Sequence, residues 1–292
     1  MKNSADAPTS QVGSRLSRPP APVRLLFWNV NNKDLRKAVC ALADATLADA
    51  VILNENSVPS TDTLRALRAS VSVDFYLPSS ISEERFQCFC RNADLDMTEV
   101  HLGCRISVRS LKLGGHRTLL VLLHGLDIRN HDDATRQSFA QSVATEIDFV
   151  KGDKGTEKVV VLGDFNMNPY DRGMNLPAGL NAMMTRACTA RGTRRHTGQA
   201  YDFYYNPMWG LFGDNTKGPA GTVYDTSDLG PYGWSIVDQV VVHHSLVALF
   251  RDVEILTDAG GESLMNRSGY PDAKTASDHF PILASFCGGG ES

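Results

Sequence analysis

A series of short apolar segments, each followed at once by a polar side chain, constrains the fold of this 292-residue chain most strongly. The segment 50–53 runs into Glu55, and the segment 158–162 runs into Asp164. Segments this short and apolar are typical of buried β-strands. If the strands end at one edge of the sheets, the polar residues that follow them meet there. Those residues are Asn29, Glu55, His124, Asp164, Asn166, Asp238, Asp278 and His279.

Helical and strand patterns interleave along the chain. The expected strands cover residues 23–30, 50–53, 85–91, 105–111, 117–123, 158–162, 236–242 and 281–286, and the expected helices cover residues 33–47, 61–69 and 134–149. Gly114-Gly115 predicts a hairpin, so the sequence favours an α/β layered domain with mixed sheets. We expect residues 1–22, rich in Ser, Pro, Ala and Gly, to form a disordered tail, residues 23–287 one domain, and residues 288–292 a flexible end.

Composition narrows the class of protein. Hydrophobic residues make up 42% and charged residues 21%, which is typical of a folded domain. No apolar run reaches the roughly 18–20 residues of a membrane span, and no secretory signal is evident, so we expect no contact with a membrane. Six scattered cysteines favour reduced thiols and a cytoplasmic location. The formal charge of −4 argues against global attraction to nucleic acid, although local attraction remains open.

The acidic residues at the strand ends indicate a metal site. Several carboxylates in one cleft repel one another unless a cation lies among them. Oxygen ligands of this kind suit Mg²⁺ or Mn²⁺ better than zinc. The sequence therefore predicts the outline of a metal-assisted phosphoryl-transfer site.

The ordered motifs also resemble a known superfamily. They are Phe27-Trp28-Asn29-Val30, Leu53-Asn54-Glu55, Leu123-His124, Gly163-Asp164-Phe165-Asn166, Val237-Asp238 and Ser277-Asp278-His279-Phe280-Pro281. In this order they resemble the endonuclease/exonuclease/phosphatase superfamily, which includes DNase I-like and exonuclease III-like nucleases. The resemblance implies a DNase I-like four-layer α/β sandwich, with two mixed sheets flanked by helices.

The resemblance also implies a ligand set for Mg²⁺ or Mn²⁺. Glu55 would hold the ion, Asn29 would support the metal site through hydrogen bonds, and Asp278 would be a further metal or water ligand. Asn31 stands where several relatives have an aspartate. It offers a neutral oxygen at best, which would weaken metal binding or change the number of bound ions.

Catalytic roles follow from the same resemblance. Asp164 would orient and deprotonate the attacking water, and Asn166 would donate its amide to the phosphoryl oxygens. Asp238 would fix the tautomer of His279, which would donate to the scissile phosphate. His124 would contact phosphate. An Asp-x-Asn turn is often only a cap, and a lone histidine after a strand is often structural, so the residues alone leave both alternatives open.

Substrate contacts are predicted in two further segments. Arg129 and Asn130 follow His124 and could reach a phosphate, although a solvated loop is an equal alternative. A basic cluster that includes Arg191, Arg194 and Arg195 precedes an aromatic run that includes Trp209. Basic residues bind phosphates and aromatic faces stack on bases. The alternative is that the aromatic residues only pack a long loop.

The leading functional prediction is a phosphodiesterase that hydrolyses nucleic acid by in-line attack of water, with DNA favoured as the substrate. RNA, a small nucleotide or another phosphoester is the alternative, because loops rather than the fold select the substrate. A catalytically silent binding module is a third interpretation, which the complete set of motif residues disfavours. A regulatory protein partner is conceivable, and the sequence indicates no oligomeric state.

Overall fold

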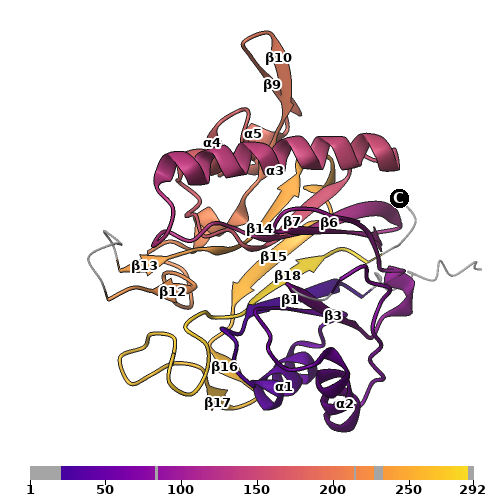
Figure 1. Ribbon diagram of the computed structural model, residues 1–292, viewed down its shortest axis with the longest axis vertical. Coiled ribbons are helices and arrows are strands. Elements are labelled where there is room, and N and C mark those ends of the chain that lie inside the picture. Colours follow the sequence, from indigo (N-terminus) through magenta and orange to yellow (C-terminus); the bar gives the residue numbers. More distant parts are fainter. Residues whose placement is uncertain (1–20, 83–84, 214, 227–232, 289–292) are drawn as a thin grey trace, which may run out of the picture.

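Two mixed β-sheets stack face to face, and helices cover their outer faces (Figure 1). The computed structural model describes residues 21–82, 85–213, 215–226 and 233–288. The helices α1 (Arg36–Thr46) and α2 (Ser60–Ser70) lie below one sheet in Figure 1, and α3 (Asp133–Lys154) lies above the other. This arrangement confirms the predicted four-layer α/β sandwich.

The first sheet has five strands in the order β15-β18-β1-β2-β3. Their bounds are Phe250–Ile255 (β15), Ile282–Phe286 (β18), Val23–Asn29 (β1), Ala50–Asn54 (β2) and Phe86–Cys90 (β3). β1 and β2 are parallel, and the other neighbours are antiparallel. Because β18 pairs with β1, the last strand of the chain lies beside the first.

The second sheet has seven strands in the order β4-β5-β6-β7-β14-β11-β8. Their bounds are Thr98–Leu102 (β4), Ile106–Leu113 (β5), His116–His124 (β6), Val159–Asp164 (β7), Asp238–His243 (β14), Tyr204–Tyr205 (β11) and Ala182–Met183 (β8). β6 and β7 are parallel, and β7 and β14 are antiparallel. The predicted hairpin at Gly114-Gly115 joins β5 to β6.

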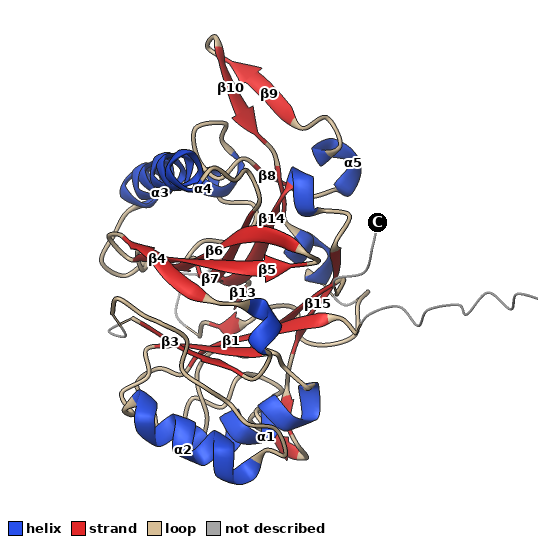
Figure 2. Ribbon diagram, turned by 90° about the vertical axis from the view of Figure 1, so that its right-hand side faces the viewer, coloured by secondary structure: helices blue, strands red, loops and turns tan. Residues whose placement is uncertain are grey.

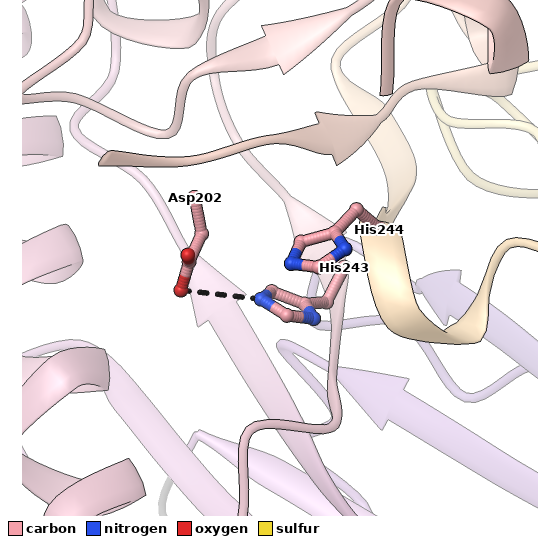
Figure 3. Close-up of side chains that lie close together, drawn as sticks. All are labelled: Asp202, His243 and His244. Atoms are coloured by element: carbon pink, nitrogen blue, oxygen red, sulfur yellow. Dashed lines mark ion pairs between the residues drawn. The ribbon is translucent and has the colours of Figure 1, made fainter. Parts of the chain in front are cut away.

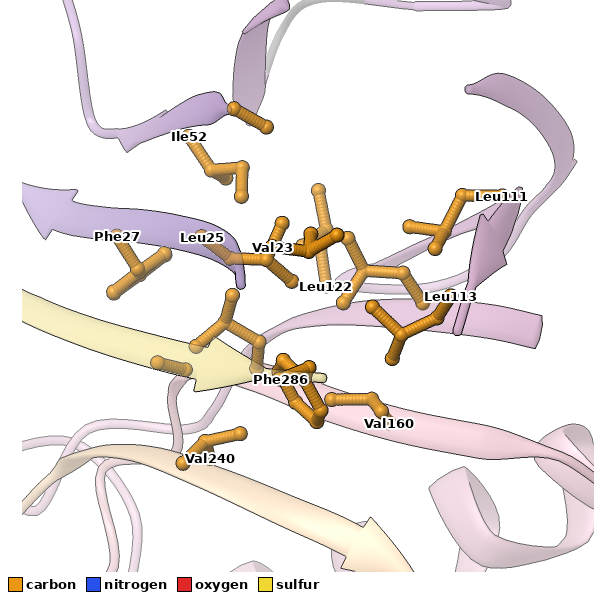
Figure 4. Close-up of a cluster of buried hydrophobic side chains, with 14 of the residues drawn as sticks. Val23, Leu25, Phe27, Ile52, Leu111, Leu113, Leu122, Val160, Val240 and Phe286 are labelled. Carbon is orange, nitrogen blue, oxygen red and sulfur yellow. The ribbon is translucent and has the colours of Figure 1, made fainter. Parts of the chain in front are cut away.

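Side chains that alternate along each strand separate the apolar core into layers. Leu25 and Phe27 of β1 point into the space between the sheets, where they meet Leu122 and Val160 of the facing sheet (Figure 4). Trp28, between these positions in the alternation, packs instead in the cluster under α1 and α2. Both faces of β1 are therefore buried, which explains its nearly continuous apolar sequence.

Both ends of the long helix α3 are well defined. Asp132 caps its start, accepting a hydrogen bond from the backbone N–H of Thr135 at 2.8 Å, and Gly155 ends it in the left-handed conformation at φ 62°. Ala140, Val143, Ile147 and Val150 form its buried stripe against the seven-stranded sheet.

The remaining elements are short and lie outside the two sheets. They are η1 (Ala93–Leu95), α4 (Arg172–Asn175), α5 (Arg186–Thr189), η2 (Pro207–Leu211), η3 (His244–Leu246) and the hairpins β9 (Thr193–His196)–β10 (Gln199–Asp202), β12 (Val223–Tyr224)–β13 (Trp234–Ser235) and β16 (Asp258–Ala259)–β17 (Glu262–Ser263). The β9–β10 hairpin projects beyond α3, away from both sheets (Figures 1 and 2).

Residues 1–20 and 289–292, which fall in the predicted tails, lie outside the described residues. Among the helices that are described, none combines the length and the apolar character required to cross a membrane.

A buried ion pair joins β4 to β5. Arg109 is 1% exposed, and its Nη2 lies 3.7 Å from Oε1 of Glu99, which is directly opposite in the strand register. Burial raises the pKa of the Glu99 carboxyl, but hydrogen bonds from the Ser107 hydroxyl and from the backbone N–H groups of Ile81 and Ser82, together with the charge of Arg109, outweigh burial and hold the pKa below its usual value.

Glu99→Gln is expected to lower the free energy of unfolding by about 3 kcal/mol at neutral pH, because it leaves Arg109 buried without a counter-charge. The folded-state pKa of Glu99 is lowered, so its stabilisation is complete above the unfolded-state value of about 4.3 and declines as the pH falls below that value. Urea unfolding should therefore show a smaller difference between the two proteins in acid. Glu262→Gln, which breaks an exposed pair with Lys37, is the control and should change stability by no more than about 1 kcal/mol. Equal losses in the two variants would contradict this account.

Candidate functional site

Polar residues from both sheets meet at one end of the sandwich, which we call the polar end. β1 ends at Asn29 beside the end of β2, and β6 ends at His124 directly opposite Asp164, the last residue of β7. Asp238, the first residue of β14, pairs with Asp164 on its other side. Parallel strands that end together, and one antiparallel strand that begins there, bring these side chains to one place.

The Asn29 side chain connects the two sheets. Its Nδ2 donates to Glu55 Oε1 at 3.3 Å and to Asp164 Oδ2 at 3.1 Å. Glu55 follows β2 in a left-handed conformation, with φ 50°, and its Oε1 lies 3.2 Å from Nε2 of His124. The hydrogen bond with His124 lowers the pKa of the Glu55 carboxyl most strongly, so this carboxyl is ionised at neutral pH.

Asp164 and Asp238 are two buried carboxylates on neighbouring strands. Burial and the charge of Asp238 raise the pKa of Asp164, and the positive charge of His279 opposes them. The Nδ1 of His279 lies 2.9 Å from Asp238 Oδ2 and 3.1 Å from Oδ1. Burial lowers the pKa of His279, but the charge of Asp238, its hydrogen bond and the charge of Asp164 outweigh burial and raise the pKa to about 10. His279 is therefore an imidazolium at neutral pH.

The turn after β7 fixes Asn166 beside Asp164. The backbone N–H of Asn166 donates to Asp164 Oδ1 at 2.9 Å, and its carbonyl accepts a hydrogen bond from Arg136 at 2.8 Å. This residue adopts φ 51°, a conformation that asparagine tolerates better than most residues. Gly125 packs so closely on the turn that a Cβ at this position would lie 1.9 Å from the Phe165 carbonyl oxygen.

Asn31 and Asp278 form a direct contact at the polar end. The Nδ2 of Asn31 donates to Asp278 Oδ1 at 2.8 Å. An aspartate at position 31 would place two carboxylates at this distance, and they would repel each other without a cation between them. Ser277 holds the segment by donating to the Asn29 carbonyl at 2.7 Å and accepting from the backbone N–H of His279 at 3.1 Å.

Two sets of side chains at the polar end could hold a divalent ion. Ligand atoms of Glu55, His124 and Asp164 all lie within 4.8 Å of one another, and so do those of Asp164, Asp238 and His279. The first set fits a cation better, because its Glu55 is ionised, whereas His279 in the second set already supplies a positive charge. Its donors, two carboxylates and one imidazole, suit Mn²⁺ and can serve Mg²⁺.

The structure also shows supporting residues that the sequence analysis missed. Asn32 Nδ2 donates to Glu55 Oε2 at 3.3 Å, and the Thr222 hydroxyl accepts from the backbone N–H of Asp238 at 3.2 Å. The run Asn29-Val30-Asn31-Asn32 could have indicated Asn32. Thr222 had no local signal, because it is brought to Asp238 by the β12–β13 hairpin.

The predicted substrate-binding residues fall into two places. Arg129 and Asn130 are exposed in the loop that follows His124, where Asp127 Oδ1 accepts hydrogen bonds from both backbone N–H groups. Trp209, in η2, packs edge-on against Tyr170 with ring centroids 6.5 Å apart.

Arg191, Arg194 and Arg195 are not brought to the polar end. They precede or lie in the β9–β10 hairpin, which leads through Phe203 into Tyr204, the partner of His243. His243 is the last residue of β14 and Asp238 the first, so the hairpin begins at the opposite end of this strand. The fold therefore places this basic cluster away from the polar end, although the sequence analysis had predicted that the cluster binds substrate.

Two stacked mixed sheets flanked by helices, with carboxylates and histidines gathered at one end, are the architecture of the DNase I-like fold. The sequence matches the model of the Endonuclease/Exonuclease/phosphatase family over residues 26–279. The chain therefore belongs to this family, whose members generally use divalent metals. A search of curated proteins found no match to the sequence.

Solved structures with the same fold include proteins of different activities. Truncated Caenorhabditis elegans TDP2 is 16% identical, with a TM-score of 0.54 over 91% of this chain and 98% of that chain. The endonuclease domain of the telomere-specific non-LTR retrotransposon TRAS1 is 14% identical, with a TM-score of 0.51 over 91% and 99%. The Bacteroides thetaiotaomicron mannosyl-6-phosphatase Bt3783 is 15% identical, with a TM-score of 0.53 over 90% and 99%. At these identities the similarity establishes the fold alone.

Proposed function

We propose that this protein is a divalent-metal-dependent phosphodiesterase that hydrolyses nucleic acid, with DNA the favoured substrate. The observation that carries the proposal is that three sets of ionisable side chains lie close together at the polar end. Asp164 is buried with a raised pKa, the Asp238–His279 pair flanks it, and Glu55 faces it across the Asn29 amide. This set can supply a base, a cationic hydrogen-bond donor and a metal ligand.

Asp164 is the proposed general base. Each of its oxygens accepts one hydrogen bond, from Asn166 N–H or from Asn29 Nδ2, and keeps a second lone pair for a water molecule. Its burial and raised pKa bring it closer to the pH at which a base works well. Asp164 would take the proton as the oxygen of water attacks phosphorus.

His279 and Asn166 are the proposed donors to the phosphoryl group. Asp238 holds Nδ1 of His279, which leaves Nε2–H to donate to an oxygen whose charge grows in the transition state. The side-chain amide of Asn166 would donate to a second oxygen. A divalent ion held by Glu55, with Asn29 and His124 beside it, would supply further stabilisation of negative charge when bound. We assign Asp278 and Asn31 to the support of this metal site, because Asn31 donates its backbone N–H to Asn29 Oδ1 at 3.0 Å and its side-chain amide to Asp278.

The proposed nucleic-acid contacts are now confined to the loop after His124 and the aromatic residues around Trp209. Arg129 is an exposed cation in that loop, and Asn130 is held by Asp127. The alternative substrates are RNA, a small nucleotide or another phosphoester. The placement of Arg191, Arg194 and Arg195 away from the polar end favours the small ones, which carry fewer phosphates to bind. The fold neighbours include both an endonuclease domain and a sugar phosphatase, so the fold admits either class.

We also infer that residues 23–287 act as one catalytic domain in the cytoplasm. The pairing of β18 with β1 supports a single domain, because the first sheet contains strands from both ends of the chain. No division of the chain at one point would therefore leave each sheet with all of its strands. The free thiols of Cys40 and Cys90, both buried in the apolar core, are consistent with a reducing compartment. A regulatory protein partner remains a proposal from the sequence.

Supercoiled plasmid incubated with Mg²⁺ or Mn²⁺ is expected to be nicked or degraded. EDTA is expected to abolish the reaction, because it removes the divalent ion that would stabilise negative charge on the phosphoryl group. The products are measured on agarose gels. RNA, abasic DNA and small phosphodiesters are assayed in parallel. Intact plasmid with cleavage of RNA or of a small phosphodiester would reject DNA and support the alternative substrates, whereas cleavage of abasic DNA alone would restrict the DNA substrate to damaged sites. Failure on every substrate would reject the enzyme and favour a silent binding module.

A further inference from the structure

Glu55, the proposed metal ligand, has a backbone conformation that its neighbours must hold in place. Its φ of 50° lies in the left-handed region, which is unfavourable for a residue that carries a Cβ. Such a conformation persists only where the surrounding structure fixes it, and it is common at functional sites. Two fixed points lie beside it. The backbone N–H of Asn32 donates to the Glu55 carbonyl at 2.7 Å, and the side chain of Asn54 donates to the Arg85 carbonyl at 2.9 Å.

A buried glutamine of β3 holds the turn that follows Glu55. Gln87 lies opposite Leu53 in the strand register and is 8% exposed. Its Oε1 accepts a hydrogen bond from Asn56 Nδ2 at 2.8 Å, and its Nε2 donates to the Val58 carbonyl at 2.9 Å. The Gln87 amide therefore uses both its acceptor and its donor on this turn.

The contacts of Gln87 connect the turn to the five-stranded sheet. Within the turn, Asn56 Oδ1 accepts from the backbone N–H of Val58 at 3.3 Å, and Asn56 Nδ2 lies 3.5 Å from the hydroxyl of Thr63 in α2. Both neighbours of Glu55 are thus bound to the β3 segment, Asn54 through a backbone carbonyl and Asn56 through Gln87. Relaxation of the Glu55 backbone would have to break one of these connections.

We propose that Gln87 is a positioning residue for the divalent ion, because it holds Glu55 in its left-handed conformation. This role rests on the function proposed above, in which Glu55 binds the ion. In the held conformation Glu55 Oε1 lies 3.3 Å from Asn29 Nδ2 and 3.2 Å from His124 Nε2. Rotation of the backbone at Glu55 would carry the carboxylate away from both. Gln87 itself contacts the turn rather than the ion.

Two substitutions that remove buried amide contacts at opposite ends of the molecule test this role. Gln87→Met keeps the length of the side chain and removes its hydrogen bonds. Asn181→Leu is the matched control, because Asn181 is 2% exposed and its Nδ2 donates to the carbonyls of Tyr201 and Asp202 at 3.3 and 2.7 Å. Asp202 lies at the end of β14 far from Asn29, where its Oδ2 is 3.2 Å from Nε2 of His243 (Figure 3).

Three measurements are made on the full chain. Hydrogen exchange of the Asn32 amide, which donates to the Glu55 carbonyl, reports in metal-free protein whether Glu55 is held. Calorimetric titration with Mn²⁺ reports the affinity for the ion, and Glu55→Gln identifies the binding that belongs to the polar end. Urea unfolding reports stability, so that a general loss of stability can be separated from an effect on Glu55.

Gln87→Met is expected to weaken Mn²⁺ binding by about tenfold or more, the effect typical of a residue that supports a metal ligand. The Asn32 amide should exchange faster in this variant, because the Glu55 carbonyl is no longer held against it. Asn181→Leu should lose a similar amount of stability and keep the Mn²⁺ affinity and the Asn32 exchange rate of the wild type. Asn56→Ala breaks the same contact from a half-buried position, should act in the same direction, and replaces Gln87→Met if that variant does not fold.

Wild-type Mn²⁺ affinity in Gln87→Met, or equal effects of Gln87→Met and Asn181→Leu on affinity and exchange, would overturn the role of Gln87 and leave the proposed enzyme in place. Absence of Mn²⁺ binding in the wild type would instead reject the metal-dependent function, and the role of Gln87 with it.

Discussion

Asp164→Asn is expected to lower the rate of phosphodiester hydrolysis by about 10²–10⁴-fold, the contribution typical of a general base. The substitution keeps the size of the side chain and removes its ability to accept a proton. It loses one of two hydrogen bonds, from Asn166 N–H or Asn29 Nδ2, but it also removes a negative charge beside Asp238. Stability should therefore change by no more than about 1 kcal/mol.

Single-turnover cleavage of a labelled substrate at saturating metal measures the rate, and urea unfolding measures stability. Asp153→Asn is the control: this aspartate pairs with Lys154 near the far end of α3 and should retain full activity. An Asp164→Asn protein that stays folded and keeps more than about a tenth of the activity would reject the assignment of Asp164 as the base.

Gly163→Ala is expected to lower the free energy of unfolding by about 4 kcal/mol or more, which places it among the most damaging single substitutions. A Cβ on Gly163 would lie 2.0 Å from the carbonyl oxygen of Leu123, its partner on the parallel strand β6. Neither backbone can move away freely, because both strands are buried in the sheet. Movement of the two strands apart would also displace His124 and Asp164, the next residue on each strand. Activity should therefore fall together with stability.

Gly152→Ala makes the same chemical change where there is room for it. Gly152 lies within α3, and a Cβ there would meet no atom within 4 Å. Alanine favours the helix by about 0.5–1 kcal/mol over glycine, so this variant should be slightly more stable than the wild type. Equal stability of the two variants in urea unfolding would show that the close approach at Gly163 is not the cause.

The sequence predicted the central strands and the helices well because their apolar periodicity is strong. Segments 50–53 and 158–162 correspond to β2 and β7 within a residue or two. β4 and β15 were missed for a physical reason: they are edge strands, and their sequences Thr98–Leu102 and Phe250–Ile255 carry charged residues that suit a half-exposed edge.

The sequence predicted those residues of the polar end that lie directly at the ends of strands, because neighbouring strand ends meet in the sheet. Glu55, Asp164 and Asp238 each follow or begin an apolar strand, and the structure gathers them. The hairpin at Arg194 could not be placed in this way, because charge patterning does not say at which end of β14 a loop leaves the sheet.

The Asn29 amide bridges carboxylates that belong to different sheets, and this has a mechanical consequence. The distance between Glu55 and Asp164 is set by the thickness of the apolar layer between the sheets, which contains Phe27, Leu122 and Val160. Side chains far from any reacting atom thus set the distance between residues of the reaction centre. Trimming a methyl group from this layer should change turnover before it changes whether the chain folds, so evolution could adjust the rate by varying buried aliphatic volume alone.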